Sequence, residues 1–205
     1  MDGFDPSEAR DAIPHGDPFA LFGAWFNAAQ ASEPNDANAM ALATAATDGR
    51  PSVRMVLLKD YGAAGFTFYT NAESRKGEEI RANPHAALLF HWKSLGRQIR
   101  IEGPLAEVSA EMADAYFASR HPDSRLGSAA SDQSRPLDAR ATYLERVAKL
   151  REHYPDGAVP RPAHWTGFRL SPERIEFWMG REYRLHERRL FVRSGQGWTS
   201  SLLYP

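Results

Sequence analysis

Three side chains that can bind an anion or exchange a proton lie close together near the end of the sequence. Arg184, His186 and Arg188 alternate with other residues in the motif RLHER. Side chains of a β-strand point to alternate faces, so a strand over residues 184–193 would place all three on one face. Their charges would repel each other unless a protein carboxylate, such as Glu176, or an anionic ligand offsets them. A solvated edge strand often carries similar basic residues, so this cluster alone leaves both interpretations open.

A second basic group lies between Arg54 and Lys76. Arg54 and Lys59 flank the four apolar residues of an expected strand. Ser74-Arg75-Lys76 then begins a short helical pattern. The free N–H groups and the partial positive charge at a helix start favour a dianion such as a phosphate. For this stretch alone, an ordinary hairpin followed by a solvated basic turn is the better interpretation.

Several common kinds of site are not indicated. The sequence has no cysteine, which excludes a thiolate nucleophile and cysteine metal ligands. Its seven histidines do not form an HExxH motif, so we expect no metal site. It contains neither GxGxxG nor GxxxxGK[ST], and it has no GxSxG elbow of a hydrolase.

The amino-acid composition limits the classes of binding partner that we expect. The 205 residues include 25 Lys and Arg against 26 Asp and Glu, a net charge of -1, so no bulk positive charge predicts nucleic-acid binding. The N-terminus lacks a signal-peptide pattern, and no apolar run is long enough to span a membrane. We therefore expect a soluble cytoplasmic protein, and the absence of cysteine fits a reducing compartment.

The elements that must position these side chains are mostly strands. We expect a flexible N-terminal arm over residues 1–16 and one domain over residues 17–205. Asp17-Pro18 predicts the start of a helix with an aromatic stripe, because Asp is a good N-cap and Pro a good first residue. Further helices are predicted after Ser74, after Ser109 and over 137–153, whereas 123–136 has no periodicity and reads as a loop. Strands are expected over 39–47, 52–59, 65–71, 86–92, 97–103, 165–170, 174–180 and 184–193. This pattern predicts a mainly β fold with flanking helices, a barrel or sandwich.

Taken together, nine motifs resemble those of the pyridoxamine 5′-phosphate oxidases. They are RMVLLK (54–59), GFTFYTN (65–71), SRKGEE (74–79), NPHAALLFHW (83–92), RQIRIEG (97–103), YFASR (116–120), SDQS (131–134), EFWMG (176–180) and RLHER (184–188). The resemblance covers nearly all of the chain beyond the arm. Each motif alone is weak, but their joint order and spacing are specific.

The resemblance implies a split Greek-key β-barrel that forms a homodimer and binds two FMN molecules in clefts between the subunits. Carried over by motif position, the FMN contacts would be Arg54, Met55, Val56, Leu57, Leu58, Lys59, Tyr69, Thr70, Arg75, Lys76, Gln98, Gln133, Ser134, Trp178 and Arg188. The substrate phosphate would contact Lys59, Tyr116, Arg120 and Ser124. Arg184, Leu185 and His186 would lie beside the substrate ring.

The reaction implied by the resemblance is the oxidation of pyridoxine 5′-phosphate or pyridoxamine 5′-phosphate to pyridoxal 5′-phosphate. Hydride would pass from the substrate C4′ to flavin N5, and O₂ would reoxidise the flavin and yield H₂O₂. Arg184 would orient the substrate, and His186 would position its polar groups or assist proton transfer. Two alternatives stay open: an FMN oxidase of another aromatic substrate, and a protein that binds flavin or pyridoxal phosphate without turnover.

Some positions depart from the family pattern. Glu187 stands where Asp is usual, Met179 where Gln is frequent, and Leu202 where Arg is frequent. Residues 127–130 replace a segment that often contains an aromatic residue. The arm also lacks the paired basic residues that are common in the family. These differences put substrate preference and closure of the arm in doubt more than FMN binding.

Overall fold

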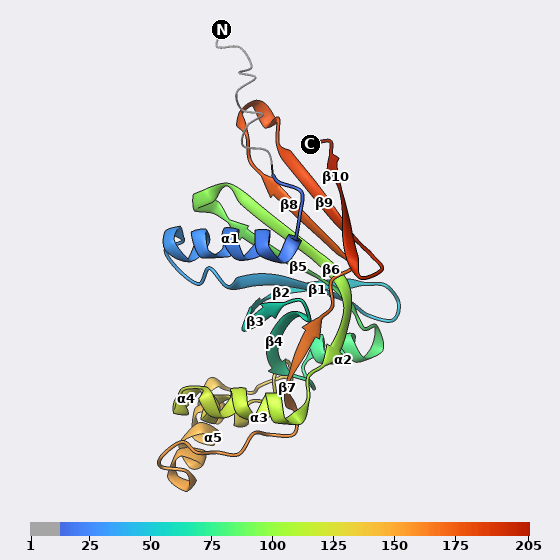
Figure 1. Cartoon of the computed structure of the whole chain (residues 1–205). Coiled ribbons are helices and arrows are strands. Elements are labelled where there is room, and N and C mark those ends of the chain that lie inside the picture. The colour runs from blue at the N-terminus through green and yellow to red at the C-terminus, as the bar shows by residue number, and fades with distance from the viewer. Residues whose placement is uncertain (1–12) are drawn as a thin grey trace.

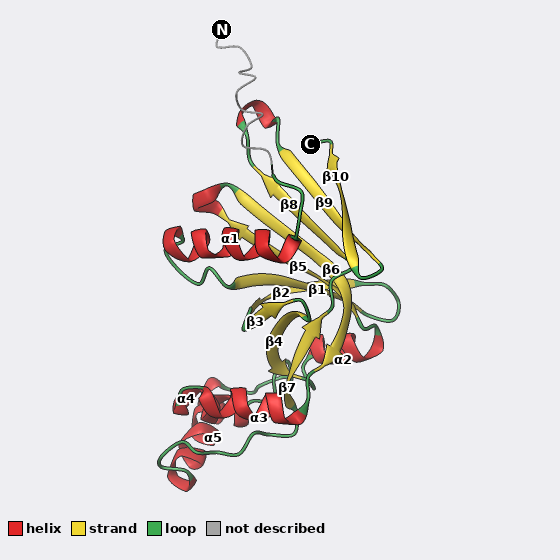
Figure 2. Cartoon of the chain, viewed as in Figure 1, coloured by secondary structure: helices red, strands yellow, loops and turns green. Residues whose placement is uncertain are grey.

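Strand β6 (Arg97–Glu107) connects the two parts of a single curled antiparallel sheet. The computed structural model describes residues 13–205, and Figures 1 and 2 show the sheet with its helices. The first six residues of β6 pair with β8 (Arg174–Met179), whereas its last three pair with β7 (Trp165–Leu170). Because β6 changes partner along its length, the sheet splits there and curls.

The main path of the sheet runs β10-β9-β8-β6-β5-β1-β2, and β7, β4 and β3 continue from the other end of β6. The remaining strands are β1 (Ala39–Ala45), β2 (Pro51–Leu57), β3 (Asp60–Gly62), β4 (Gly65–Asn71), β5 (His85–Trp92), β9 (Glu187–Ser194) and β10 (Gly197–Leu203). The helices are α1 (Pro18–Ser32), α2 (Arg75–Ala82), α3 (Ala110–Ser119), α4 (Pro122–Ala129) and α5 (Arg140–His153). This architecture confirms the predicted mainly β fold with flanking helices.

Helix α1 packs its aromatic residues against strands β4, β5 and β8. Asp17 caps it as predicted, because its carboxylate accepts hydrogen bonds from the backbone N–H groups of Phe19 and Ala20. The helix buries the aromatic ring of Phe22, which packs edge-to-face against Phe66 and Phe90 with ring centroids 4.9 and 5.3 Å apart. Such pairs add about 0.5–1.5 kcal/mol beyond area burial. The aromatic stripe thus fixes α1 on the core.

Strands β4 and β7 approach each other closely at Gly65. Its φ of +124° is unfavourable for residues with a side chain, and a Cβ atom here would lie 2.1 Å from the backbone oxygen of Leu170. Glycine therefore allows β4 to pair with β7 at its first residues. This pairing places Tyr69 and Thr70, near the end of β4, in a fixed register opposite Gly167 and Thr166.

Helices α3, α4 and α5 form a lobe at one end of the molecule, and the β8–β9 turn lies at the opposite end (Figure 1). A small apolar cluster of Phe117, Leu126, Val159 and Trp165 holds the lobe together. The predicted loop over 123–136 is wrong in its first half, where α4 forms. The dipeptide His121-Pro122 follows the end of α3, as a helix stop does, and it also starts α4: the His121 Nδ1 accepts a hydrogen bond from the Asp123 N–H, and Pro122 is the first helical residue.

The described part of the predicted arm begins at Ile13, which is buried in the main core. Its N–H donates to the Glu187 carboxylate, and its carbonyl accepts a hydrogen bond from Arg189 Nε at 2.6 Å. Residues 1–12 lie outside the described residues, so an arm there stays a prediction. Attachment to the domain, however, begins before the predicted boundary at residue 17.

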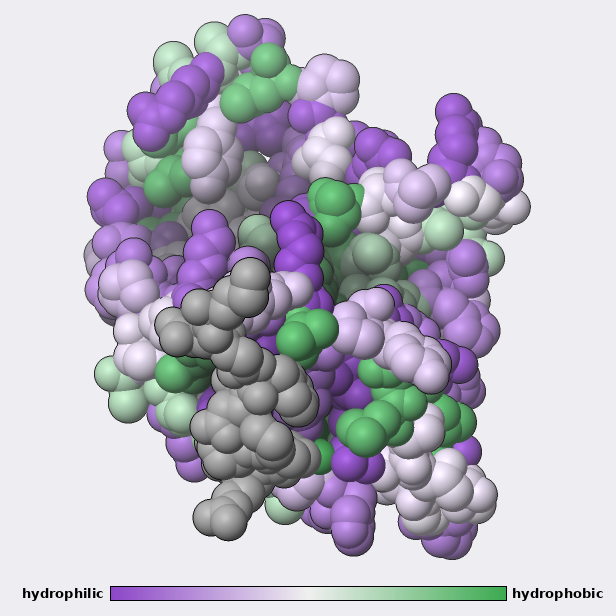
Figure 3. All heavy atoms as spheres, turned by 90° about the horizontal axis from the view of Figure 1, so that it is seen from above, coloured by the Kyte–Doolittle hydropathy of each residue, from purple (hydrophilic) through white to green (hydrophobic). Residues whose placement is uncertain are grey.

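Apolar side chains reach the surface on the edge strand β2. Val53 and Met55 are 68% and 63% exposed, and Leu57 lies on the same face. Figure 3 looks onto the end of the molecule that carries the β8–β9 turn, where apolar residues lie among polar ones; Tyr183 and Leu185 of this turn are also exposed. A row of exposed apolar residues on an edge strand is typical of a surface covered by a partner.

Candidate functional site

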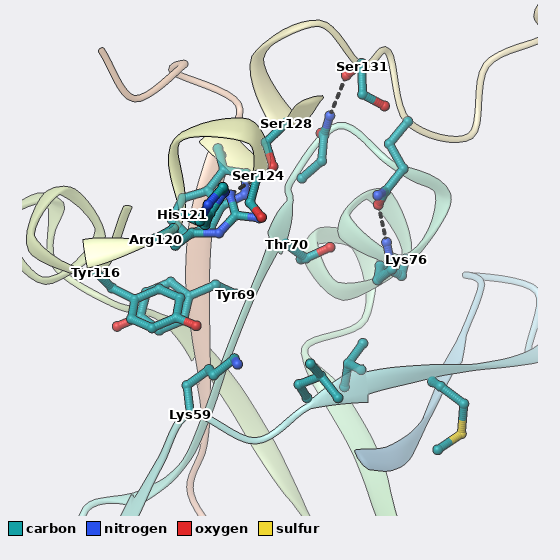
Figure 4. Close-up of a pocket in the computed structure, with 16 residues that line it drawn as sticks. Lys59, Tyr69, Thr70, Lys76, Tyr116, Arg120, His121, Ser124, Ser128 and Ser131 are labelled. Carbon is teal, nitrogen blue, oxygen red and sulfur yellow. Dashed lines mark hydrogen bonds between the residues drawn. The ribbon is translucent and has the colours of Figure 1, made fainter. Parts of the chain in front are cut away.

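A pocket of about 520 Å³ lies between the sheet and the helical lobe (Figure 4). Strands β2 and β4, the residues between β2 and β3, helix α2 and the α3–α4 corner contribute to its wall. Its size is within the range of small-molecule sites. The lining residues are Met55, Val56, Leu57, Lys59, Tyr69, Thr70, Asn71, Lys76, Tyr116, Arg120, His121, Ser124, Ser128, Ser131, Gln133 and Trp165. The structure thus brings together most of the predicted residues between Met55 and Gln133, which form the first half of the predicted site.

In the described chain, the pocket carries charged side chains of one sign only. Lys59, Lys76 and Arg120 line it, and no Asp or Glu among the described residues does. None of the three forms an ion pair with a carboxylate of the described chain. Lys76 and Arg120 are partly buried, whereas Lys59 is exposed. A partly buried cation without a counterion favours an anionic ligand, because the ligand then replaces the lost hydration. The pocket is therefore suited to anions.

One cationic position lies at the start of α2. Lys76 Nζ donates to Ser74 Oγ at 2.9 Å and to Gln133 Oε1. Burial, and next the charge of Arg54, lower the pKa of Lys76 to about 8. Its two protein partners are neutral oxygens, so the ammonium charge is solvated but not neutralised. This arrangement fits the phosphate predicted for this stretch.

Arg54 and Arg75, which were also predicted to contact FMN, face a buried carboxylate instead of the pocket. Glu79 Oε1 accepts from Arg75 Nε at 2.9 Å, and its Oε2 lies 3.2 Å from Arg54 Nη2. Burial by itself would raise the pKa of Glu79, but hydrogen bonds from Ser52, Thr44 and the two arginines hold it at about 2. Both arginines therefore share one counterion within the chain, which leaves a net positive charge on this group of three side chains.

A stack of aromatic rings forms the opposite wall. Tyr69 lies against Tyr116 with ring centroids 4.1 Å apart and planes 19° apart, and it stacks on Trp165 at 5.4 Å. Burial raises the pKa of Tyr69, so it stays a neutral phenol at physiological pH. Lys59 Nζ stands 5.9 Å from the centre of the Tyr116 ring. Figure 4 shows Lys59 on one side of the stacked tyrosines and Arg120 on the other.

The second cationic position lies at the α3–α4 corner. Arg120 has its guanidinium carbon 5.0 Å from the centre of the Trp165 ring, and its Nη1 donates to Ser128 Oγ at 2.8 Å. Burial lowers the pKa of Arg120, which marks a partly desolvated cation. The predicted Ser124 lines the pocket beside it. Sequence reasoning missed the lining residues His121, Ser128, Asn71, Ser131 and Trp165.

The missed residues carried only weak signals. Asn71 and Ser131 belong to the quoted motifs GFTFYTN and SDQS, so their neighbours pointed to them. Trp165 begins an expected strand, where a tryptophan is usually a core residue. Ser128 lies in the stretch predicted as a loop, and only the helix α4 places it one turn from Ser124.

The second half of the predicted residues lies elsewhere, across β6, β8 and β9. Gln98 is opposite Trp178, and Trp178 is opposite Arg188. Arg188 Nε donates to Glu176 Oε1 at 2.7 Å, and this hydrogen bond raises the pKa of Arg188. In Figure 1 these strands extend away from the lobe that carries the pocket. None of these residues lines the pocket of the described chain.

Arg184, Leu185 and His186 lie in the turn between β8 and β9. The predicted strand over 184–193 is wrong in its first three residues, because a 3₁₀ turn forms over Glu182–Arg184 and β9 begins at Glu187. Tyr183 and Arg184 have φ of 52° and 62°, which no strand permits. The three basic residues therefore do not share one strand face.

This turn holds the imidazole of His186 in a defined position. His186 Nδ1 accepts a hydrogen bond from the Arg181 N–H at 3.2 Å, and its ring centre lies 4.6 Å from that of Trp178. In the neutral imidazole the proton is therefore assigned to Nε2. Glu187, which departs from the family pattern, pairs with Arg181 and binds the N–H of Ile13.

Of the other predicted contacts, Leu58 is a buried core residue and Ser134 lies in a turn with a φ of 72°. Among the other departures, Met179 packs against the main core, and Leu202 is exposed on β10. Over residues 13–205, no group of three or more histidine or acidic residues could hold a metal ion. No helix in the same range is long and apolar enough to cross a membrane.

Comparisons with known proteins agree with these observations. Residues 26–154 match the family described as pyridoxamine 5′-phosphate oxidase, and residues 165–205 match the pyridoxine 5′-phosphate oxidase C-terminal dimerisation region. A pyridoxine/pyridoxamine 5′-phosphate oxidase of Novosphingobium aromaticivorans is 69% identical over 95% of this chain and 97% of its own. One from Gluconobacter oxydans is 66% identical over 92% of this chain and 94% of its own.

Two solved structures share the fold. PhzG from Burkholderia lata, in complex with tetrahydrophenazine-1-carboxylic acid, is 33% identical with a TM-score of 0.89 and covers 100% of this chain and 99% of its own. A pyridoxamine 5′-phosphate oxidase-related, FMN binding protein from Nostoc punctiforme has a TM-score of 0.74 at 18% identity, over 94% of this chain and 100% of its own. The two family matches and the full-length relatives lead to one assignment: the chain belongs to the pyridoxamine 5′-phosphate oxidase family.

Proposed function

We propose that the protein is an FMN-dependent oxidase that converts pyridoxine 5′-phosphate and pyridoxamine 5′-phosphate to pyridoxal 5′-phosphate, with O₂ as the electron acceptor. One observation carries this proposal: the pocket offers three cations and no described carboxylate, with Lys76 and Arg120 on different elements. Two such positions suit two phosphate groups, one on the cofactor and one on the substrate.

The residues around Lys76 fit a flavin phosphate. Lys76, Gln133 and Thr70 would hold it, and the edge of β2 from Met55 to Leu57 would lie along the ring. Arg54 lies near enough to lower the pKa of Lys76 and, together with Arg75, would add positive potential behind it. FMN, when bound, supplies the two-electron oxidation chemistry and transfers the electrons to O₂. The protein contributes binding and orientation.

The residues around Arg120 fit the substrate phosphate. Arg120, Tyr116 and Ser124 present a guanidinium, a phenol and a hydroxyl to the same side of the pocket. Lys59 lies next to the Tyr116 ring and would contact both ligands. Each charge-assisted hydrogen bond to a phosphate contributes roughly 1.5–3 kcal/mol, so this set selects phosphorylated substrates.

We propose that a partner subunit supplies the second half of the site. Gln98, Trp178 and Arg188 lie outside the pocket of their own chain, as do Arg184 and His186 in the β8–β9 turn. Four of these five fall within residues 165–205, which match the dimerisation region. The exposed apolar row of β2 adjoins the pocket, so a dimer that covers this row would bring a second chain to the site.

In this dimer the turn residues would act on the substrate ring. Arg184 would orient the substrate and stabilise negative charge that develops on it. His186 would donate a hydrogen bond from Nε2, because Nδ1 is occupied by the Arg181 N–H. Through this Nε2 hydrogen bond the residue would position a substrate oxygen or nitrogen.

The assay is direct. The FMN-loaded protein is incubated with pyridoxine 5′-phosphate or pyridoxamine 5′-phosphate in air, and aldehyde and H₂O₂ are measured. We expect both products with both substrates. A protein that binds FMN but forms neither product would be a binding protein, and the enzymatic proposal would fail.

Mixed dimers test the shared site. Arg120→Ala disables one half of the site and Arg184→Ala the other, so each homodimer should be inactive. Refolded as an equal mixture, half of the dimers are mixed, and each of these has one intact site; activity should return to about a quarter of wild type. If each subunit used only its own residues, no mixture would regain activity.

A second candidate follows from PhzG, whose structure holds a tetrahydrophenazine carboxylic acid. An FMN oxidase of such aromatic acids would keep the flavin residues but would not need a phosphate position at Arg120. The partly desolvated Arg120 next to Ser124 favours the phosphorylated substrates instead. Turnover of a phosphate-free aromatic acid, without turnover of either phosphate, would favour the alternative.

A further inference from the structure

We infer that Ser128 is a positioning residue for Arg120 and thereby sets the preference for a phosphorylated substrate. This inference rests on the proposed function. Ser128 belongs to the segment 127–130, where the sequence departs from the family pattern, and no motif pointed to it. It lines the pocket on α4, four residues after Ser124, so that both hydroxyls lie on one face of the helix (Figure 4).

The contact between the two side chains is well formed. Arg120 Nη1 donates to Ser128 Oγ at 2.8 Å, a normal length for a charge-assisted hydrogen bond. A serine inside a helix commonly bonds to the backbone carbonyl four residues earlier. Ser128 instead has its oxygen on the guanidinium, which is the only side-chain hydrogen bond of Arg120 among the described residues.

This hydrogen bond orients the guanidinium, because the two rings that it lies over offer no hydrogen-bond acceptor. Arg120 lies over the rings of Phe117 and Trp165 at 5.7 and 5.0 Å. These rings restrict its position along the ring normal but leave rotation of the planar group in the ring plane free. The Ser128 oxygen fixes this rotation. Bidentate binding of a phosphate depends on that orientation, because the N–H donors have fixed directions.

Ser128 is itself held in place from α5. The Tyr143 hydroxyl donates to the backbone oxygen of Gly127 at 3.0 Å, and the Ala130 N–H donates to the Leu126 oxygen. The last turn of this short helix is thus anchored at the residues on both sides of Ser128. A side chain on a fixed turn can act as a reference point for a longer, more flexible one.

The test compares Ser128→Ala with Ser119→Ala in the FMN-loaded protein. Ser119 has a hydroxyl that donates to the Tyr116 carbonyl oxygen and does not line the pocket. Loss of a charge-assisted hydrogen bond should raise KM for pyridoxine 5′-phosphate about tenfold in Ser128→Ala, with kcat unchanged within about twofold. Ser119→Ala should keep the wild-type KM. Ser128→Thr, which retains the hydroxyl, should restore KM.

A binding measurement separates this inference from the proposed reaction. Calorimetric titration with pyridoxal 5′-phosphate should show about tenfold weaker binding in Ser128→Ala, whereas pyridoxal without phosphate should bind equally to both proteins. In an Arg120→Ala background the effect of Ser128→Ala should disappear, since it acts through Arg120. Unchanged binding of pyridoxal 5′-phosphate by Ser128→Ala would overturn the inference, even if the enzyme were inactive. Loss of turnover in the wild type would overturn only the proposed function.

Discussion

The two cationic regions of this chain differ in how their charges are balanced. In the β8–β9 region, Arg188 is paired with Glu176 and Arg181 with Glu187. In the pocket, Lys59, Lys76 and Arg120 have no carboxylate partner in the described chain. Both regions contain several basic residues, so the number of Lys and Arg alone would not distinguish them. The balance of charge distinguishes a region that already has its counterions from one that requires them from a ligand.

The same distinction divides the predicted phosphate contacts. Lys76 meets only neutral oxygens, whereas Arg54 and Arg75 share Glu79. The stretch from 54 to 76 therefore holds two kinds of cation. Lys76 is available to a ligand, whereas Arg54 and Arg75 bind a carboxylate of the protein itself. Variants that remove one kind or the other should have different consequences, which range from a large loss of activity to a small change in pH dependence.

The largest effect should come from the turn of the ion-paired region. Arg184→Ala and His186→Ala should each lower kcat/KM by about 10²–10³-fold, because these groups act on the reacting substrate. Binding of FMN and the melting temperature should stay close to wild type, since neither side chain belongs to the core. Steady-state kinetics check the first point and flavin fluorescence titration the second. Wild-type kcat/KM in both variants would contradict their assigned roles.

Removal of the Glu79 carboxylate should affect the stability of the fold more than the binding of ligands. Glu79→Ala leaves Arg54 partly buried without its counterion, and we expect a loss of about 3 kcal/mol in the free energy of unfolding, near the lower end for broken buried pairs. Arg75 is exposed and should contribute little of this loss. Urea unfolding measures the change. Glu78→Ala is the matched control, because Glu78 lies on the same helix as Glu79 and forms an exposed ion pair with Arg135. This variant should lose less than about 1 kcal/mol of the free energy of unfolding.

The pKa of Glu79 gives this prediction a pH dependence. Its native pKa is about 2, against an ordinary glutamate value of 4.5. The stabilisation is therefore complete above pH 4.5 and is lost as the pH falls towards 2. The difference in stability between wild type and Glu79→Ala should shrink over this acid range. A constant difference from pH 6 to pH 3 would mean that the carboxylate charge is not the cause.

Lys59→Met tests the third pocket cation, which lies next to the Tyr116 ring. We expect both the dissociation constant of FMN and that of pyridoxal 5′-phosphate to rise about tenfold, because Lys59 contacts both ligands in the proposed site. Lys93→Met, a substitution in an exposed 3₁₀ turn, is the control. Weakening of only one ligand would assign Lys59 to that ligand alone.

The smallest effect is a pH dependence of FMN binding through Lys76. With a pKa of about 8, Lys76 is charged in the free protein below pH 8 and must take up a proton to bind the phosphate above it. The affinity for FMN should thus be about fourfold lower at pH 8.5 than at pH 7. Riboflavin, which lacks the phosphate, should show no such decrease. Lys76→Met should bind FMN more weakly at pH 7 and without this dependence.

The sequence predicted the parts of the molecule that follow from local patterns. The helix after Asp17, the helices after Ser74 and Ser109, and most strands appear where their caps and periodicity indicate. The pocket half of the site also follows the motifs. Two local errors have physical reasons: His121-Pro122 can end one helix and begin the next, and the positive φ of Tyr183 and Arg184 occurs in residues that rarely adopt it.

Other features depend on contacts that no short stretch of sequence contains. Glu79 is bound to Thr44, Ser52 and Arg54, which come from two earlier strands, so its role as their counterion required the fold. The link between Arg120 and Ser128 required α4. The separation of the predicted residues into two distant groups required the arrangement of β8 and β9 relative to the helical lobe.

The anchoring of Ile13 has a consequence for the order in which the protein can be completed during synthesis. Ile13 leaves the ribosome well before its hydrogen-bond partners Glu187 and Arg189, which follow 174 and 176 residues later. Chains fold during synthesis from the N-terminus onward, so this segment must wait for almost the whole chain. We expect a nascent chain stalled before residue 187 to remain cleavable by protease near Ile13, and a released full chain to be protected there. The synthesis of β9 would then also be the step that closes the core around Ile13.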